Sequence, residues 1–399
     1  MLKNNDLEHS TKSDVVILAG GFGTRLIDEI GSEIPKCLAK INDKPLLQSQ
    51  LELCKRHNFK NILILLHHLS EKVIDFVGDG SKFGLKVRYS IENEPRGTAG
   101  AVTDILNLLS DKFIVIYGDT YLDVDLKKFY DSFDESCSML TFCHPNSHPH
   151  DSDLLVLDDS DRVIDVFRPN KSSKNYYNNI VNAALYISKK DAFKKVVPKS
   201  GMMDISSEMF PQMIKKGMPI KAYKSVEYIK DMGTPNRYQL VQSDIKNKIP
   251  NLLSSQIKRK CVFLDRDGVI NREVGHLNDI NKFELINDSA RAIKLLNSFG
   301  YLVICVTNQP VIARGDLSFS GLRKIHMKME ACLGDEGAYI DDIFICPHHP
   351  ENGFKNEIKA LKITCNCRKP APGMILSAIE KHNIDPAKSW LVGDHERDI

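Results

Sequence analysis

The sequence has no apolar run that approaches the roughly 20 residues needed by a bilayer-spanning helix. Residues 1–13 are polar and lack the apolar core of a secretion signal, so we interpret them as a flexible leader. The formal net charge is only +2, which provides no basic field for nucleic acid. There is no internal repeat, and in particular no hexapeptide array of a β-helix. These absences argue against a membrane protein, a nucleic-acid-binding protein and a repeat protein.

Cysteine is present, but without the spacing of a disulfide scaffold. Seven of the ten cysteines are scattered through apolar or helical stretches, as Cys54, Cys261 and Cys305 illustrate, and are interpreted as reduced core residues. This usage predicts a reducing compartment, the cytoplasm. Of the 399 residues, 42% are hydrophobic and 27% are charged, which is typical of soluble globular domains and sufficient for two cores.

Strand-like apolar runs alternate with helical patterns along nearly the whole chain, which predicts three-layer α/β domains with mostly parallel sheets. The polar segment 245–259 is interpreted as a linker between a first domain at 14–244 and a second at 260–399. The expected strands are Val15–Leu18, Asn61–Leu66, Lys86–Ser90, Phe113–Tyr117, Cys261–Leu264, Tyr301–Thr307, Ile343–Cys346 and Ser389–Val392. The expected helices are Leu46–His57, Ser70–Val77, Ala99–Leu109, Ser289–Phe299, Leu322–Cys332 and Gly373–His382.

Three glycines follow the first expected strand, in the segment LAGGFGTRL at 18–26. Their bare backbone N–H groups suit phosphate, and Arg25 adds donors for a triphosphate. Taken alone, such a loop is also a common strand-to-helix turn. Five further motifs support the phosphate interpretation: IPKCL with Lys36, EPRGTAGAV at 94–102, YGDT with Asp119, VNAALY at 181–186 and KDMGTPNRY at 230–238.

In order and spacing these motifs resemble the sugar-1-phosphate nucleotidyltransferases over residues 14–243, and most of all the heptose-1-phosphate and mannose-1-phosphate guanylyltransferases. The resemblance implies a Rossmann-like fold, with GTP and a sugar phosphate as substrates. The sugar phosphate would attack the α-phosphorus, and catalysis would rest on positioning and charge stabilisation. By resemblance, Asp119 and Asp231 hold Mg²⁺, while Arg25 and Lys36 offset the charge of the triphosphate. The substrates would contact Gly20, Gly21, Gly23, Thr24, Gly97, Asn182 and Arg168.

Each carboxylate alone has a plainer interpretation, since Asp119 suits a helix N-cap and Asp231 a turn. Two departures from the family pattern affect the choice of sugar and base. Phe167, Arg168 and Pro169 stand where Glu-Lys-Pro is common, so Arg168 is expected to replace the lysine, although the two cations differ. Arg96 stands where leucine is common.

The second half carries four motifs: FLDRDGVIN at 263–271, TNQ at 307–309, CRKP at 367–370 and VGDHERD at 392–398. Their order resembles the haloacid-dehalogenase phosphatases, a second Rossmann-like fold in tandem with the first. The resemblance implies that Asp265 attacks phosphorus and that Asp267 serves as general acid and then as general base. It also implies Mg²⁺ at Asp265, Asp267 and Asp394.

The same resemblance implies that Thr307 and Lys369 hold the phosphoryl oxygens, with Asn308 and Arg368 at the substrate. The plainer interpretations are a solvated surface lysine for Lys369 and a turn aspartate for Asp394. The occurrence of all these residues in one series favours the catalytic interpretation.

Cysteine and histidine gather in CPHHP at 346–350 and CNC at 365–367. Cys346, His348, Cys365 and Cys367 offer three thiolates and one imidazole, a set that suits tetrahedral Zn²⁺ in a closed structural site. The spacing is not that of a zinc finger, and two reduced cysteine pairs are the alternative. The loop nevertheless resembles that of heptose-bisphosphate and histidinol-phosphate phosphatases. His349 is expected to support this loop or the substrate loop and not to bind the metal.

CPHHP together with TNQ-x-x-IARG resembles the heptose branch more than the histidinol branch, although Pro310 and Val311 replace the usual Ser-Gly. The fold is expected to continue past Ile399, so the second domain is interpreted as truncated. The resulting hypothesis is a bifunctional enzyme that removes the 7-phosphate of heptose 1,7-bisphosphate and then makes GDP-heptose.

Two alternatives stay open. One is a nucleotidyltransferase for another sugar, such as mannose, joined to a histidinol-type phosphatase. The other is a chain in which one half is catalytically silent and serves as a sensor or assembly module. No nucleic-acid or membrane partner is expected, and the oligomeric state, including a homo-oligomer, is left open.

Overall fold

The computed structural model describes residues 12–170 and 176–398. They form two compact units, one of residues 12–143, 155–167 and 182–250, the other of residues 144–154, 168–170, 176–181 and 251–398. The first eleven residues of the expected leader, and Ile399, lie outside the described residues. Within the described ranges, no helix is both long and apolar enough to cross a membrane.

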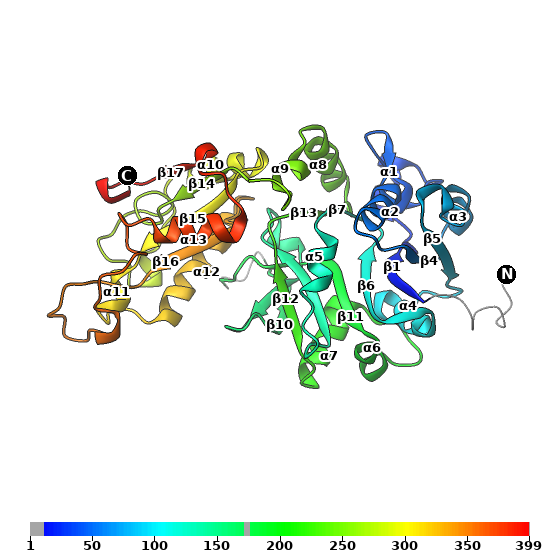
Figure 1. The fold of residues 1–399 in the computed structure, drawn as a ribbon, viewed down its shortest axis with the longest axis horizontal. Helices are drawn as coiled ribbons and strands as arrows, with labels where there is room; N and C mark the ends of the chain where they lie inside the picture. Colours follow the sequence, from blue (N-terminus) through cyan, green and yellow to red (C-terminus); the bar gives the residue numbers. More distant parts are fainter. Residues whose placement is uncertain (1–11, 171–175, 399) are drawn as a thin grey trace. The chain divides into compact units, whose positions relative to one another are not determined.

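The first unit is built on a nine-stranded mixed sheet (Figure 1). Its main path has the order β10-β9-β11-β6-β1-β4-β5, and β8 and β12 extend it from β11. Strands β6, β1, β4 and β5 are mutually parallel, whereas β11 runs antiparallel to β6. The strands are β1 (Ser13–Leu18), β4 (Asn61–Leu66), β5 (Lys86–Ile91), β6 (Leu109–Tyr117), β8 (Met139–His144), β9 (Leu154–Leu157), β10 (Val163–Phe167), β11 (Val181–Lys189) and β12 (Ile220–Lys224).

Helices cover both faces of this sheet. On one face, buried side chains of β1, β4 and β6 pack against α2, α3 and α5. On the other face, Phe193 of α6 lies against Phe113 and Phe210 of α7 lies against Tyr186. Two antiparallel pairs, β2 (Lys40–Ile41) with β3 (Lys44–Pro45) and β7 (Thr120–Asp123) with β13 (Tyr228–Asp231), stand apart from the sheet. The helices are α1 (Ile27–Ile30), α2 (Leu46–Arg56), α3 (Ser70–Val77), α4 (Gly97–Asp104), α5 (Leu126–Asp131), α6 (Lys190–Val196), α7 (Phe210–Lys215), α8 (Pro235–Lys246) and α9 (Ile249–Leu253).

The second unit contains a four-stranded parallel sheet of order β16-β15-β14-β17 (Figure 1). Apolar side chains of β14 and β15 pack against α10 and α12, and α13 lies against β15 and β16. The elements are β14 (Cys261–Leu264), β15 (Leu302–Asn308), β16 (Asp342–Cys346), β17 (Trp390–Val392), α10 (Ser289–Ser298), α11 (Pro310–Ala313), α12 (Phe319–Asp335) and α13 (Gly373–His382). The α/β fold class predicted from the alternation of elements is therefore confirmed in both units.

Two segments from the middle of the chain also belong to the second unit. His150 Nε2 lies 2.5 Å from an oxygen of Asp335, at the end of α12, and Asn178 donates to Glu330 at 2.6 Å. Helix α12 is thus covered partly by residues that lie far from it in the sequence.

One predicted helix is wrong at its end. Helix α4 stops at Asp104 instead of Leu109, a short 3₁₀ turn follows, and Leu109 already begins β6. Leu109 is fully buried and pairs with β1, so burial in the sheet outweighs the local helical pattern. The expected linker at 245–259 is partly helical, because α8 runs to Lys246 and α9 follows.

Candidate functional sites

A cavity of about 530 Å³ opens at the carboxyl ends of the parallel strands in the first unit. Its walls include the predicted glycine loop with Thr24 and Arg25, together with Lys36, Gly97 and Asp119. Gly97 begins α4 with φ +70, and a Cβ there would lie 2.5 Å from Met203 O, so only glycine fits this turn. Gly233 of the KDMGTPNRY motif also lines the cavity, so the structure gathers motifs from the start and the end of the first unit around one hollow.

The charged centre of this cavity is an ion pair between Lys36 and Asp119. Lys36 Nζ lies 2.5 Å from Asp119 Oδ2, and the lysine side chain is 13% exposed against 32% for the aspartate. Asp119 lies between the end of β6 at Tyr117 and the start of β7 at Thr120, so it stands at the edge of the sheet and does not cap a helix. The ammonium and the carboxylate therefore face the same space as the glycine loop.

Asp231 reaches the same region from β13. Its register partner on β7 is Thr120, and Met232 N donates to Asp119 O at 2.8 Å, so the backbone segments that carry the two predicted metal-binding aspartates lie side by side. Arg237 holds the Asp231 carboxylate with contacts of 2.7 and 2.9 Å. Gly233 N also donates to it at 2.9 Å, as the turn interpretation expects.

Arg168 and Asn182, which were predicted to contact the substrates, and Arg96, which was noted as a departure from the family pattern, have other partners. Arg168 is absent from the lining of the cavity and donates to Asp153 at 2.8 Å. Asn182 is also absent, and its amide bonds to Thr141, Tyr186 and Ser206. Arg96 lines the cavity, but its guanidinium bonds to Asp104 and to the carbonyls of Pro198 and Gly201. It braces the chain around α4.

The motif search did not single out Glu92, which also lines the cavity. A Cβ on Gly20 would lie 3.4 Å from Glu92 Oε2, so the carboxylate sits beside the start of the glycine loop. Burial raises the pKa of Glu92, and Arg96 N donates to it over a long 3.4 Å. The carboxylate thus has acceptor capacity to offer a ligand.

In the second unit, a lysine stands between two buried aspartates. Lys369 Nζ lies 2.9 Å from Asp265 Oδ2 and 2.6 Å from Asp398 Oδ1, and all three side chains are at most 5% exposed. Burial raises the pKa of the Asp265 carboxyl, and the Lys369 ammonium opposes that rise. Lys369 is therefore no solvated surface lysine.

Three carboxylates converge here, since Asp265, Asp394 and Asp398 each offer an oxygen within 4.8 Å of the others. Asp265 follows β14 and Asp394 follows β17, and parallel strands bring their carboxyl ends to one edge. Asp398 was missed in the sequence, although it is the second aspartate of the VGDHERD motif. The second aspartate of that motif was the signal from which its role could have been predicted.

Asp267 is held as a carboxylate by its neighbours. Arg266, which is fully buried, contacts both oxygens at 2.7–3.1 Å, and Asn271 and Gln309 each donate at 3.0 Å. Burial acts to raise the pKa of Asp267, but Arg266 and these hydrogen bonds outweigh it and leave the pKa below its usual value. To protonate a leaving group, Asp267 must give up some of these hydrogen bonds and contact the leaving oxygen of the substrate instead.

A second cavity, of about 280 Å³, lies over these carboxylates. Of the residues singled out in the sequence, Asp265, Asp267, Thr307, Asn308 and Arg368 line it, whereas Lys369 and Asp394 do not. Asn308 also fixes the lysine loop, because its amide exchanges hydrogen bonds of 3.0 and 3.1 Å with the backbone of Lys369. His276, His395 and Arg397 add further nitrogen-bearing side chains to the wall.

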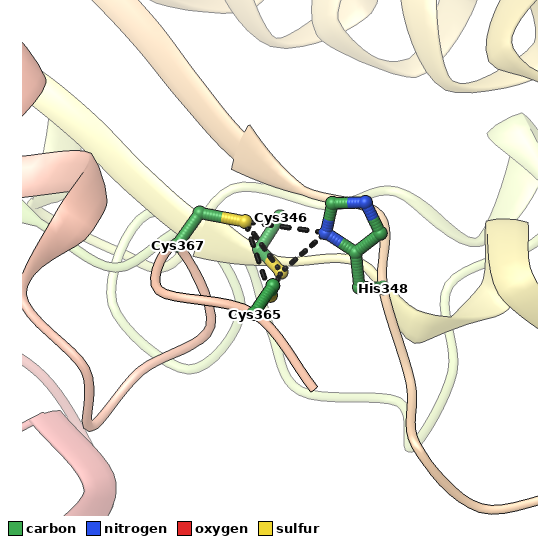
Figure 2. Close-up of side chains that lie close together, drawn as sticks. All are labelled: Cys346, His348, Cys365 and Cys367. Carbon is green, nitrogen blue, oxygen red and sulfur yellow. Dashed lines mark hydrogen bonds between the residues drawn. The ribbon is translucent and has the colours of Figure 1, made fainter. Parts of the chain in front are cut away.

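The predicted cysteines and histidine converge into one cluster, here called the Cys/His cluster (Figure 2). The three sulfurs lie 3.2–3.6 Å apart, and His348 Nδ1 lies 3.2 Å from Cys367 Sγ and 3.8 Å from Cys346 Sγ. Zinc–sulfur bonds of ~2.3 Å at tetrahedral angles separate sulfurs by ~3.8 Å, slightly more than the distances here, so the donor set fits that ion after a small outward shift of the thiolates. His349 is not part of this cluster.

Comparisons with known proteins divide the chain in the same way. A family model described as nucleotidyl transferase matches residues 14–248, and one described as HAD-hydrolase-like matches residues 366–399. The C-terminal part is similar to the D-glycero-β-D-manno-heptose-1,7-bisphosphate 7-phosphatase of Pasteurella multocida, with 43% identity over 141 residues, which are 35% of this chain and 74% of that protein. The protein of the same name from Escherichia coli K12 is 38% identical over 139 residues, 35% of this chain and 71% of that protein.

Among solved structures, HddC from Yersinia pseudotuberculosis is similar at a TM-score of 0.51 and 28% identity, over 58% of this chain and 99% of that one. The same values hold for its complex with GMP-PN.

Proposed function

Because the chain belongs to the nucleotidyl transferase family through residues 14–248, and through its C-terminal part to the family of the heptose-1,7-bisphosphate 7-phosphatases, we propose that it is a bifunctional enzyme of GDP-heptose synthesis. The phosphatase removes the 7-phosphate of heptose 1,7-bisphosphate. The transferase then joins the remaining 1-phosphate to the guanylyl group of GTP and releases pyrophosphate.

The observation that carries this proposal is a lysine–aspartate ion pair at each of two separate cavities. Lys36 and Asp119 both line the first cavity beside the glycine loop. At the second cavity Asp265 lines the wall, and the buried Lys369 contacts it from behind the wall. At each centre the lysine ammonium can contact the phosphate of the substrate. The carboxylate beside it can act as a nucleophile or as a metal ligand.

In the phosphatase centre, Asp265 attacks phosphorus and the C7 oxygen leaves with a proton from Asp267. Water, deprotonated by Asp267, then cleaves the aspartyl phosphate and releases inorganic phosphate. Lys369 and Thr307 donate hydrogen bonds to the phosphoryl oxygens. Contacts with Asp265, Asp398 and Asn308 hold Lys369 in position. In the transferase centre, the glycine loop, Arg25 and Lys36 hold the triphosphate while the sugar phosphate attacks.

We also propose Mg²⁺ at both centres and Zn²⁺ in the Cys/His cluster. Oxygen ligands at Asp265, Asp394 and Asp398, and at Asp119 with Asp231, are those that Mg²⁺ prefers, and bound Mg²⁺ supplies charge neutralisation to the phosphates. The ten free cysteines favour a reducing compartment, so we place the enzyme in the cytoplasm.

A phosphorus NMR time course tests the proposal as a whole. The protein is mixed with Mg²⁺, GTP and heptose 1,7-bisphosphate. Inorganic phosphate is expected first, followed by pyrophosphate and a GDP-sugar. Two results would contradict the coupled sequence: release of pyrophosphate before any release of phosphate, and release of phosphate that is not followed by consumption of GTP.

Guanine is proposed as the base because Glu92 is a carboxylate in the cavity, and only guanine among the common bases offers it two neighbouring N–H donors. Replacing Glu92 by glutamine is expected to lower kcat/KM for GTP by about 10- to 100-fold, since a charged hydrogen-bond acceptor is lost. It should also narrow the preference for GTP over ITP, which lacks the exocyclic amino group.

Steady-state kinetics with both nucleotides measure this effect. The matched control is Glu94→Gln, because Glu94 is exposed two residues away and does not line the cavity. An unchanged preference for GTP over ITP in Glu92→Gln would rule out recognition of guanine by Glu92.

The parent protein is expected to contain about one zinc per chain, and Cys367→Ser is expected to contain almost none. The variant should also lower the Tm of the phosphatase unit by roughly 5 °C or more, because metal binding is coupled to folding. Elemental analysis and a thermal melt measure the two effects. Cys332→Ser is the control, since Cys332 lies on α12 outside the Cys/His cluster. A variant with full zinc content would show that Cys367 is not a ligand.

A further inference from the structure

Arg314 lies between the phosphatase cavity and the loop that separates the two halves of the Cys/His cluster. It follows α11 directly, and its two terminal nitrogens reach two different imidazoles. Nη1 contacts His276 Nε2, and Nη2 lies 3.2 Å from His349 Nε2. His276 belongs to the wall of the cavity, whereas His349 is 5% exposed and adjoins the cluster residue His348. One guanidinium therefore joins the substrate cavity to the metal-proximal loop.

The rest of that loop is fitted closely around Arg314. The guanidinium carbon lies 4.6 Å from the centre of the Phe354 ring, and Lys362 Nζ lies 4.5 Å from the same centre. The Lys362 side chain is only 3% exposed, so two cations are held against one aromatic ring within the protein. Such a ring stabilises charge only in a fixed geometry, which limits the movement of Arg314.

Backbone contacts fix the same junction. Ile358 N donates to Ala313 O at 2.9 Å, which ties the loop to the end of α11. Gly315 has φ +76, and a Cβ there would lie 1.9 Å from Asn356 O, so the loop passes too close for any side chain. The loop, α11 and Arg314 thus form one closely packed assembly beside the cavity.

We propose that Arg314 is a positioning residue that sets the orientation of His276, and thereby the affinity of the phosphatase cavity for the part of the substrate beyond the reacting phosphate. The inference rests on the proposed phosphatase function. Asp265 and Lys369 define where the reacting phosphate lies, and His276 comes from a separate segment of the wall. A planar guanidinium that donates to two imidazoles fixes the orientation of both rings relative to each other, which a lysine ammonium does not do.

Kinetics on two substrates test this role. Arg314→Met and Arg314→Lys are expected to raise KM for heptose 1,7-bisphosphate by about 10-fold and to leave kcat within about 2-fold, since binding and not the chemical step is altered. Both variants should hydrolyse p-nitrophenyl phosphate, which has no sugar, as the parent does. Arg291→Met is the control, because Arg291 is 83% exposed on α10 and pairs only locally with Asp288 in the described part of the chain.

A spectroscopic measurement keeps the proposal separate from the choice of substrate. In long-range ¹H–¹⁵N spectra of the imidazoles, His276 is assigned by the signal lost in His276→Gln. Because Arg314 donates to Nε2 of His276, Nε2 must be the acceptor and the ring proton must lie on Nδ1. The His276 signals are therefore expected to shift in Arg314→Met and to stay unchanged in Arg291→Met.

Unchanged His276 signals in Arg314→Met would overturn the proposal, as would equal losses of kcat/KM on both phosphate esters. A parent enzyme that hydrolyses p-nitrophenyl phosphate but not the bisphosphate would instead contradict the proposed substrate. In that case a shift of the His276 signals still supports the role of Arg314.

Discussion

Replacing Asp265 by asparagine is expected to reduce phosphate release from heptose 1,7-bisphosphate by roughly 10⁴-fold or more, because loss of a covalent nucleophile is among the costliest single changes in an enzyme. Asparagine keeps the size of the side chain but offers Lys369 only a neutral oxygen in place of the carboxylate at 2.9 Å. Guanylyl transfer to heptose 1-phosphate should stay within about 2-fold of the parent. Phosphate release and pyrophosphate release, assayed separately, measure the two activities.

The control for this experiment is Asp288→Asn. Asp288 is an exposed aspartate of the same unit that pairs with Arg291 on the surface. Two outcomes would contradict the assignment: residual phosphatase activity close to that of the parent, which would remove Asp265 from the role of nucleophile, and a parallel loss of both activities, which would mean that the two centres are not independent.

Replacing Asp119 by asparagine is expected to have the reciprocal effect, a fall in guanylyl transfer of roughly 10²- to 10³-fold, because the carboxylate proposed to hold the charge-neutralising Mg²⁺ is removed. The change also leaves Lys36 without the carboxylate that holds it at 2.5 Å. Release of phosphate from the bisphosphate should be unaffected. A pyrophosphate-release assay with heptose 1-phosphate and GTP measures the loss.

Asp111→Asn is the matched control for Asp119→Asn, because Asp111 lies on the same strand, β6, with its side chain 93% exposed. If Asp119→Asn transfers the guanylyl group as fast as this control, Asp119 has no place in the reaction. Equilibrium binding of GTP to both variants then separates a loss of nucleotide affinity from a loss of the chemical step.

The strands were the most predictable part of this fold. Runs such as Asn61–Leu66 and Cys261–Leu264 are buried on both faces, so their apolar character is continuous and easily recognised. The end of α4 was not predictable in this way, because it depends on Leu109 pairing with a strand almost 100 residues earlier in the chain.

The candidate sites divide along the same line. Residues at the carboxyl ends of strands, such as Asp119, Asp265 and Thr307, lie where their motifs place them because the strand fixes their position. Arg168 stands on a segment whose path no motif specifies, and its long side chain finds Asp153. Glu92 was not noticed, and Arg314 was noted only as part of the IARG segment without a role, because the significance of both comes from neighbours that only the folded chain provides.

The lysine held between Asp265 and Asp398 has an electrostatic consequence for the phosphatase centre. With Asp394 included, three carboxylates face one ammonium, so these four side chains together carry an excess of two negative charges. A phosphate dianion approaching this centre is repelled until a divalent cation brings the local sum to zero. Cation and phosphate ester therefore favour each other's entry, and after hydrolysis the affinity for the released phosphate depends on whether the cation stays.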